Sequence, residues 1–278
     1  MRCGISTSCF YPETPLEALH KLIGAGAPVA EVFINTFAEL EEGYVNKLVA
    51  AQRASGIQVV SVHPFSAVME GFLFASDYKT RFDDGVKLYR QFFHLCARLG
   101  ATMLVFHGDH AHALNSFTME RYVHRFRKLA AVGREYGVTL CHENVYYCRL
   151  GEPDAVRRFR ALMGEDAAFV LDLKQVRRAG AHLADMLDAM AGAVRHVHIS
   201  DFAPGRDCLP PGEGQLDFIR LVRHLEATGY TGDYIVELYR DNFADDTELY
   251  ESMQYVETLI GRAAPAAPEV RLAAEGWQ

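Results

Sequence analysis

Four acidic or imidazole side chains stand where strand-like apolar runs end, spread over half of the chain. They are Glu143 in VTLCHEN, Asp172 in AFVLD, His198 in VRHVHIS and Glu237 in YIVEL. The connecting loops and helix N-termini converge at the carboxyl ends of parallel strands, so residues at equivalent strand ends can meet. Three carboxylates and one imidazole form a hard, oxygen-rich set that is typical of a single divalent metal site.

A second interpretation is that each of these residues separately caps a loop or forms a surface ion pair. Any one of them alone would favour that interpretation. The equivalent strand position of all four favours the metal site instead. The ligand types are matched to Mn²⁺ first, with Mg²⁺, Co²⁺ or Zn²⁺ as alternatives.

The elements that must position these residues alternate along the whole chain, with strand-like runs followed by amphipathic helical stretches. The predicted strands cover residues 3–8, 29–34, 57–62, 102–107, 138–143, 168–172, 195–200 and 234–238. The intervals leave room for a loop, a helix and a return loop, so the strands should be parallel with right-handed crossovers. Eight such units predict the α/β class and a (β/α)8 TIM barrel.

Helices are predicted over 82–99, 118–136, 153–163 and 215–228. A glycine follows the first, second and fourth of these ranges, which is a typical helix stop. No Gly/Ser linker or change in composition divides the chain. The prediction is a single barrel domain over 1–262 and an Ala/Pro-rich C-terminal tail over 263–278.

Composition excludes several classes of protein. The chain has 278 residues, 50% of them hydrophobic, and 28 basic against 36 acidic residues give a net charge of −8. That balance argues against an electrostatic grip on nucleic acid. No apolar run approaches the roughly 18 residues that span a membrane, and no signal-peptide pattern opens the chain. The six cysteines form no CxxC pair and are expected to be buried and reduced, as in a soluble cytoplasmic protein.

Several short motifs together carry a family resemblance. They are HEN at 142–144, LDLKQ at 171–175, HVHISD at 196–201, PPGEGQLDF at 210–218 and IVELY at 235–239. With them the chain, from residue 3 to about residue 260, resembles the xylose isomerase-like TIM barrels. That group contains sugar isomerases and epimerases such as D-tagatose 3-epimerase, with inosose dehydratase and endonuclease IV as relatives.

The resemblance implies roles for the four strand-end residues. Glu143, Asp172, His198 and Glu237 match the metal ligands of the family, and Glu143 and Glu237 also match the carboxylates that move the proton in the epimerases. The implied activity is isomerisation or epimerisation of a sugar or sugar phosphate through a metal-stabilised enediolate. The implied partner is a small sugar, and the resemblance suggests dimers or tetramers.

Further residues are candidates for contact with the substrate. His63 and His107 end the third and fourth predicted strands. They could contact substrate hydroxyls, hold a second metal as in the endonuclease IV relatives, or be hydrogen-bonded core histidines. Arg206 resembles the loop arginine with which the epimerases touch substrate oxygens, although a solvated loop arginine is the alternative.

Two more candidates come from the regions around the strand ends. Lys174 could bind an acidic substituent of the substrate, or it could be a surface lysine at a helix start. Glu70 lies in the long aromatic stretch 65–78, which is either a lid over the sugar or core packing under a loop. Glu70 is an expected extra substrate contact.

Other activities fit less well. Dehydration of a polyol ketone, as in inosose dehydratase, begins with the same proton abstraction, so the sequence does not separate it from epimerisation. An endonuclease IV-like DNA repair hydrolase is disfavoured, because Gln175 stands where that family has a metal-binding histidine and because the net charge is −8. A barrel that only binds a sugar would not need two acid/base carboxylates.

Overall fold

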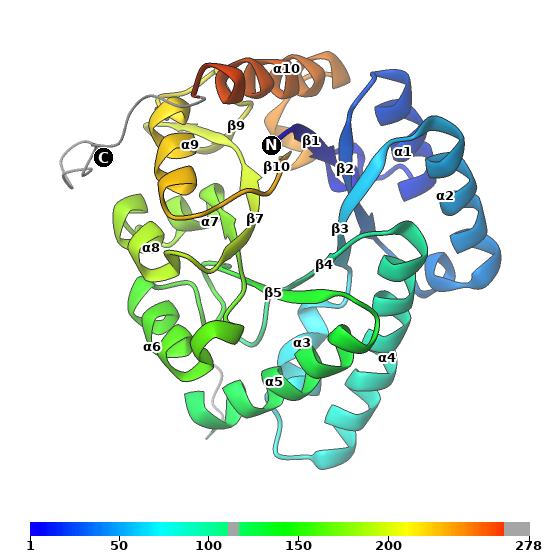
Figure 1. The fold of residues 1–278 in the computed structure, drawn as a ribbon, viewed down its shortest axis with the longest axis vertical. Coiled ribbons are helices and arrows are strands. Elements are labelled where there is room, and N and C mark those ends of the chain that lie inside the picture. Colours follow the sequence, from blue (N-terminus) through cyan, green and yellow to red (C-terminus); the bar gives the residue numbers. More distant parts are fainter. Residues whose placement is uncertain (111–116, 264–278) are drawn as a thin grey trace.

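The computed structural model describes residues 1–110 and 117–263. Eight parallel strands close into a barrel in the order β1-β10-β7-β6-β5-β4-β3-β2, and helices surround it (Figure 1). The strands are β1 (Cys3–Ser6), β2 (Val29–Ile34), β3 (Gln58–Pro64), β4 (Met103–Phe106), β5 (Thr139–Glu143), β6 (Phe169–Asp172), β7 (Val194–Ile199) and β10 (Tyr234–Val236). The predicted (β/α)8 barrel is therefore confirmed, and each predicted strand overlaps an observed one.

The helices lie between the strands and cover the outside of the barrel. They are α1 (Pro15–Gly24), α2 (Glu42–Ser55), α3 (Ala67–Phe74), α4 (Lys79–Leu99), α5 (Met119–Glu135), α6 (Pro153–Met163), α7 (Leu173–Arg178), α8 (Leu183–Met190), α9 (Phe218–Ala227) and α10 (Asp246–Ala263). Helix α10 ends one residue past the predicted domain boundary. The rest of the predicted tail, from residue 264, lies outside the described residues.

Local sequence signals explain where several helices begin and end. Thr14 and Glu17 form a reciprocal capping box at the start of α1, which satisfies two backbone N–H groups that have no partner within the helix. The Thr118 side chain accepts from the backbone N–H of Arg121 at the start of α5. Gly100 has φ 70° after the last turn of α4, a left-handed conformation that favours glycine.

The main hydrophobic core lies between the strands and the helices rather than inside the barrel. On α4, Tyr89, Phe92 and Phe93 are fully buried, and the Tyr89 ring meets Phe106 of β4 edge to face at 5.8 Å. Burial of one such ring stabilises the fold by roughly 1.5–3 kcal/mol. A smaller cluster is formed by Val105, Cys141, Ala168 and Val170. Because side chains alternate along a strand, Cys141 points to the same side of β5 as Glu143.

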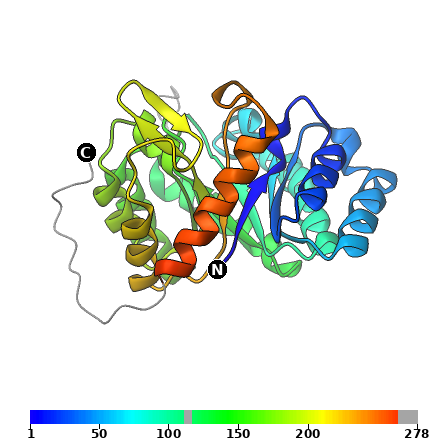
Figure 2. The ribbon, with the colours of Figure 1, turned by 90° about the horizontal axis from the view of Figure 1, so that it is seen from above.

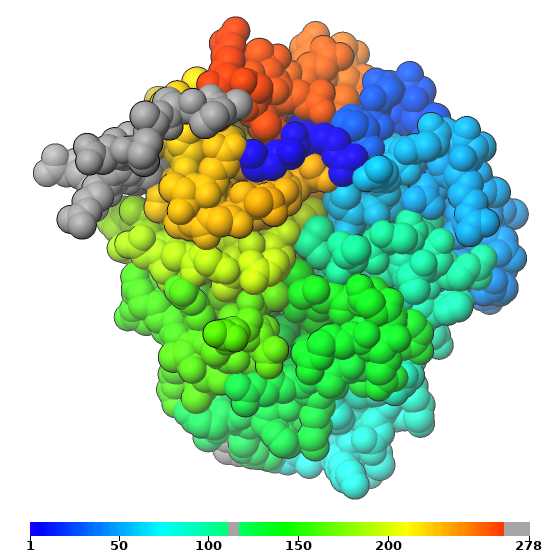
Figure 3. Space-filling view, in the orientation of Figure 1, coloured from blue at the N-terminus to red at the C-terminus, as the bar shows by residue number. Residues whose placement is uncertain are grey.

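The two ends of the barrel differ in what covers them. A two-stranded hairpin, β8 (Asp201–Ala203) and β9 (Arg206–Leu209), follows β7 and lies on the opposite side of the molecule from the N-terminus (Figure 2). The N-terminal residues lie beside α10 (Figure 3), and the backbone N–H of Cys3 donates to Glu257 at 3.4 Å. The strands therefore run from the N-terminal face toward the hairpin face.

The stretch 65–78 forms the short helix α3 and its flanks. Phe74 is buried, and its ring packs edge to face against Phe82, Tyr89 and Phe106. The core-packing interpretation is thus confirmed for Phe74, whereas Val68 and Phe72 on the same helix are exposed.

All six cysteines are buried and free, as the sequence predicted. Among the described residues, no helix combines the length and the apolar character needed to cross a bilayer.

Candidate metal centre and cavity

The four predicted ligands meet at the carboxyl ends of β5, β6, β7 and β10. One ligand atom from each of Glu143, Asp172, His198 and Glu237 lies within 4.8 Å of the others, and all four side chains are buried. The register of the sheet produces this meeting, since Asp172 stands beside His198 and Ile235, two residues before Glu237, also stands beside His198. Side chains at these levels project into the same end of the barrel.

His198 presents one ring nitrogen to the carboxylates. Its Nε2 lies 3.0 Å from Glu31 Oε2, and a carboxylate there fixes the proton on Nε2. Its Nδ1 lies 3.3 Å from Glu237 Oε2 and 3.7 Å from Glu143 Oε1. Burial alone would lower the pKa of His198, but the charges of Glu237 and Glu31 outweigh it and raise this pKa well above its usual value.

This donor set fits a divalent cation. Among the described residues, His198 Nδ1 is buried without a hydrogen-bond partner of good geometry. With no ion bound, a proton on Nδ1 meets the negative charge of the surrounding carboxylates, and a divalent ion would replace that proton on binding. An imidazole held by a carboxylate on its far nitrogen is the usual arrangement of a metal-binding histidine.

Asp172 performs two tasks at once. Its Oδ1 accepts from the backbone N–H of Gln175 at 3.2 Å and so caps α7. Its Oδ2 faces the site, 3.8 Å from His198 Nδ1. The side chain of Asn144 forms two hydrogen bonds with the backbone of Asp172, donating to its carbonyl at 3.0 Å and accepting from its N–H at 2.8 Å. The HEN motif therefore ties the end of β5 to the end of β6, a role for Asn144 that the sequence did not reveal.

Lys174 is buried beside the same carboxylates. Only 3% of its side chain is exposed, and Nζ forms ion pairs with Asp172 Oδ2 and Glu237 Oε2. The interpretation of a surface lysine is therefore wrong. Burial would lower the pKa of Lys174, but Asp172 and Glu237 outweigh it and hold this pKa well above its usual value. The ammonium is thus charged and already engaged.

Glu31 is the main residue that sequence reasoning missed. It is fully buried in β2. Besides contacting His198, its carboxylate accepts hydrogen bonds from the hydroxyls of Ser6 at 3.1 Å and Ser61 at 2.8 Å, and it lies 3.0 Å from His196 Nε2. Its pKa is held well below the usual value, because these imidazole contacts outweigh the effect of burial. The available signal was a glutamate inside the apolar run VAEVFI, where an unpaired charge would be costly.

His63 and His107 also reach the site. Their Nε2 atoms lie 2.9 Å apart, and His107 Nε2 lies 2.8 Å from Glu143 Oε2. One ligand atom from each of these three residues falls within 4.8 Å of the others. Both rings line the cavity described below, so substrate contact and a second metal both agree with their placement.

Glu70 lies behind His107 rather than in the cavity. Its Oε2 accepts from the backbone N–H groups of His107 at 2.8 Å and Gly108 at 2.5 Å, and Oε1 accepts from the Tyr89 hydroxyl. With both oxygens occupied and 1% of the residue exposed, Glu70 supports the loop that carries His107. The expected direct contact with substrate is corrected accordingly.

Arg206 is exposed on the hairpin strand β9 and does not line the cavity. The loop that follows the hairpin is organised by Asp201, another residue that the sequence did not single out. Its carboxylate accepts from the backbone N–H groups of Gly212 at 3.1 Å, Gly214 at 2.9 Å and Leu216 at 3.0 Å. A Cβ at residue 214 would lie 2.3 Å from Asp201 Oδ1, which explains the glycine there.

A cavity of about 680 Å³ opens beside two of the four candidate ligands, Glu143 and Glu237. Glu143 and Glu237 lie in its floor, and aromatic rings form much of its wall, contributed by Tyr11, Phe33, Tyr147 and Tyr239. Lys174 and Arg240 are the lysine and arginine among its described lining residues. The Arg240 guanidinium donates to the carbonyls of Phe243 at 3.0 Å and Ala244 at 3.3 Å. A mostly apolar wall over a few convergent charged groups is typical of a small-molecule site.

Sequence comparison places the chain in a known family. Residues 19–259 match the xylose isomerase-like TIM barrel family, so the chain belongs to that family. A curated relative, the L-ribulose-5-phosphate 3-epimerase UlaE of Shigella boydii serotype 18, is 32% identical over 79 residues. That match spans 28% of this chain and 28% of the relative.

Solved structures agree on the fold. The chain superimposes on a D-psicose 3-epimerase with D-tagatose from Clostridium cellulolyticum H10 with a TM-score of 0.77 and 15% identity, covering 96% of this chain and 100% of that one. A xylose isomerase-like TIM barrel protein from Mycobacterium smegmatis in complex with magnesium gives a TM-score of 0.74 and 15% identity, with 95% and 98% covered. At these identities the likeness establishes the fold alone.

Proposed function

We propose that the chain is a divalent-metal-dependent sugar epimerase or isomerase that abstracts a proton next to a carbonyl. One observation carries the proposal: two carboxylates, Glu143 and Glu237, cluster with Asp172 and His198 and also line a cavity of about 680 Å³. The epimerases among the relatives support the reaction class, and the magnesium complex of the Mycobacterium smegmatis protein supports the metal.

The metal would be held by Glu143, Asp172, His198 and Glu237, with Mn²⁺ the first candidate. When bound, a divalent cation supplies positive charge beside the substrate's carbonyl oxygen, where negative charge develops as the neighbouring proton leaves. Glu31 holds His198 in the tautomer that the site needs. Asn144 fixes the backbone of Asp172 in position.

Glu143 and Glu237 would move the proton. They approach the cavity from strands β5 and β10, which are separated in the barrel by β6 and β7. Two carboxylates that reach a sugar from different directions can take a proton from one face and return one to the other. His107, 2.8 Å from Glu143 Oε2, orients that carboxylate.

An uncharged sugar fits the cavity better than a sugar phosphate. The ammonium of Lys174 is paired with two carboxylates, and the guanidinium of Arg240 is bound to backbone carbonyls. The Arg240 fork is therefore engaged, and a lysine ammonium, paired or displaced, is a point charge that cannot form the bidentate contact by which arginine recognises phosphate. The aromatic wall, by contrast, suits the apolar faces of a sugar.

The test is proton exchange. The purified protein is stripped with a chelator, reloaded with Mn²⁺ and incubated in D₂O with a panel of free and phosphorylated ketoses. We expect metal-dependent deuterium uptake at a carbon next to the carbonyl, fastest with free ketoses. Uptake accompanied by loss of water would indicate a dehydratase, and no exchange with any ketose in the reloaded protein would contradict the proposal.

A further inference from the structure

Lys174 contacts two of the residues that would bind the metal. We propose that it is a tethered cation that competes with the divalent ion for Asp172 and Glu237 and turns toward the substrate cavity when the ion binds. This inference rests on the metal centre proposed above. It adds a role for a residue that the metal centre itself does not require.

The ammonium contacts oxygen atoms that would face the proposed ion. Lys174 Nζ pairs with Asp172 Oδ2 and Glu237 Oε2. These same two oxygens lie 3.8 Å and 3.3 Å from His198 Nδ1, the ring nitrogen that faces the site. A cation bound by the imidazole and these carboxylates must therefore share its ligand oxygens with the ammonium or displace it.

Electrostatics makes sharing unfavourable. The site is buried, with Asp172 1% and Lys174 3% exposed, so charges a few ångströms apart are poorly screened by solvent. The ammonium stabilises the carboxylates while no ion is bound. Once a doubly charged ion lies on the same oxygens, the two cations repel each other. Part of the binding energy of the ion is then spent on displacing the lysine.

The cavity offers Lys174 a direction in which to move. Its backbone is fixed, because Asp172 caps the start of α7 and Gln175 Oε1 accepts from the backbone N–H of Tyr146 at 3.3 Å. Its side chain lines the cavity, and Nζ lies 5.6 Å from the centre of the Tyr239 ring, also in the cavity wall. A flexible four-carbon stem can move the ammonium toward that ring, which is a favourable environment for a cation.

Displacement would place a hydrogen-bond donor in the cavity. A freed ammonium has three N–H groups and can donate to a hydroxyl or carbonyl oxygen of a sugar. Metal loading would then assemble the metal centre and the substrate contact in one step.

The experiment measures metal affinity and thermal stability without turnover. Chelator-treated wild-type protein, Lys174→Met and Arg240→Met are titrated with Mn²⁺ by calorimetry, and their melting temperatures are recorded with and without Mn²⁺. Arg240→Met is the matched control, because it removes the other long cationic side chain from the same cavity without touching a carboxylate. Lys174→Arg keeps the charge and is expected to keep the competition.

We expect Lys174→Met to bind Mn²⁺ about tenfold more tightly than the wild type, because the competing cation is gone. Its metal-free form should melt at a lower temperature, and Mn²⁺ should raise that temperature more than in the wild type. Arg240→Met should bind Mn²⁺ with an affinity close to that of the wild type. If Lys174→Met requires Mn²⁺ to fold, competition with a chelator gives its affinity.

The alternative outcomes separate this inference from the proposed function. Equal or weaker Mn²⁺ binding by Lys174→Met, with normal binding by the wild type, overturns the competition and leaves the metal centre standing. No binding by either protein overturns the metal centre and this inference together. If Arg240→Met gained as much Mn²⁺ affinity as Lys174→Met, the gain would come from removing any positive charge near the site. That result would also overturn the inference.

Discussion

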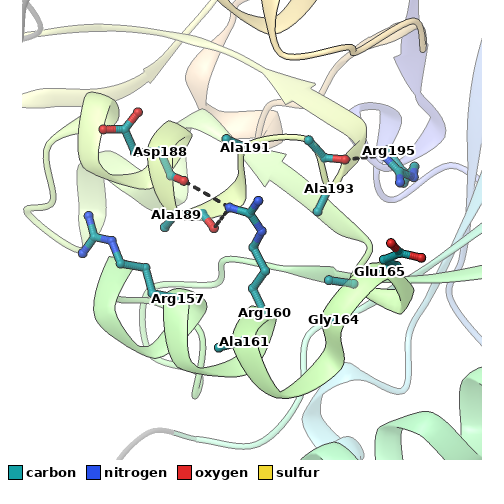
Figure 4. Close-up of a pocket in the computed structure, with 12 residues that line it drawn as sticks. Arg157, Arg160, Ala161, Gly164, Glu165, Asp188, Ala189, Ala191, Ala193 and Arg195 are labelled. Atoms are coloured by element: carbon teal, nitrogen blue, oxygen red, sulfur yellow. Dashed lines mark hydrogen bonds between the residues drawn. The ribbon is translucent and has the colours of Figure 1, made fainter.

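Two cavities lie at opposite ends of the barrel, and the larger one is not the candidate site. A cavity of about 790 Å³ lies near the start of β6 and β7, between α6 and α8, with Arg157, Arg160 and Arg195 in its wall (Figure 4). The cavity above the proposed metal centre measures about 680 Å³. Size alone would have selected the first.

The arginines of the larger cavity donate hydrogen bonds to backbone carbonyls around them. Arg160 Nη1 donates to the carbonyls of Asp188 at 3.4 Å and Ala189 at 3.3 Å, at the end of α8 (Figure 4). Arg157 donates to the carbonyl of Asp185, and Arg195 to that of Gly192. The last carbonyls of a helix have no partner within it, so basic side chains there satisfy and stabilise the helix end.

At the other end the charged groups face one another. Glu143, Asp172, Glu237 and His198 converge with a buried ring nitrogen left unpartnered by the described residues. Carboxylates buried this close together are costly unless cations lie among them, and Lys174 supplies one positive charge here. The two ends therefore differ in what their charged groups contact. At the candidate site, charged side chains from different strands contact one another, whereas at the other end basic side chains contact backbone carbonyls.

The largest expected effect is a loss of turnover when a carboxylate of the candidate metal centre is replaced. Glu143→Gln should lower turnover by about 10²–10⁴-fold, since it removes one acid/base group while keeping the shape of the side chain. Steady-state kinetics on the ketose found by deuterium exchange measures this loss, and circular dichroism checks the fold. Arg160→Ala, in the larger cavity, is the matched control and should leave turnover unchanged. Comparable losses in both variants would refute the assignment of roles to the two ends.

The second effect concerns the support of the metal centre. Glu31→Gln should weaken Mn²⁺ binding by about 10–100-fold, because a neutral amide no longer fixes the proton of His198 on Nε2. Calorimetric titration of the chelator-treated protein measures the affinity. Glu31→Asp keeps the charge and should recover part of the loss. Unchanged affinity in Glu31→Gln would show that His198 needs no such support.

The third effect is a loss of stability when Arg160, in the cavity between α6 and α8, is replaced. Arg160→Ala should lower the free energy of unfolding by about 1 kcal/mol, the usual net contribution of such hydrogen bonds. Urea denaturation followed by circular dichroism measures it, with wild-type protein unfolded in parallel. A variant as stable as the wild type would mean that the helix end is satisfied by water instead.

The smallest effect tests whether the barrel interior between the two ends is closed. Burial raises the pKa of the Cys9 and Cys141 thiols to about 12, so both stay protonated and unreactive near neutral pH. We expect no reaction of the native protein with a thiol reagent at pH 8 and full reaction in denaturant. Rapid labelling of native Cys141, identified by peptide mass, would show that the interior opens.

The candidate ligands could be predicted because they follow local rules. Asp172 and Glu143 end apolar runs of strand length, and a residue at a strand end in a barrel faces a shared cleft. Glu70 and Lys174 show where that reasoning stops. Glu70 was expected to touch substrate, yet it accepts from the backbone of His107. Lys174 was left open between surface and substrate, yet it pairs with Asp172 and Glu237.

The sequence by itself determined the eight strands, their order along the chain and the residues that stand at their ends. The periodicity of apolar residues, the turn residues and the strand lengths that indicate them are all local properties of the chain. Only the tertiary structure decided which side chains touch. Glu31 meets His198 across 167 positions of sequence, and Lys174 meets Glu237 across 63. Those contacts depend on how the barrel closes and on the register of neighbouring strands. No local pattern encodes them, because they are fixed by the packing of the whole chain.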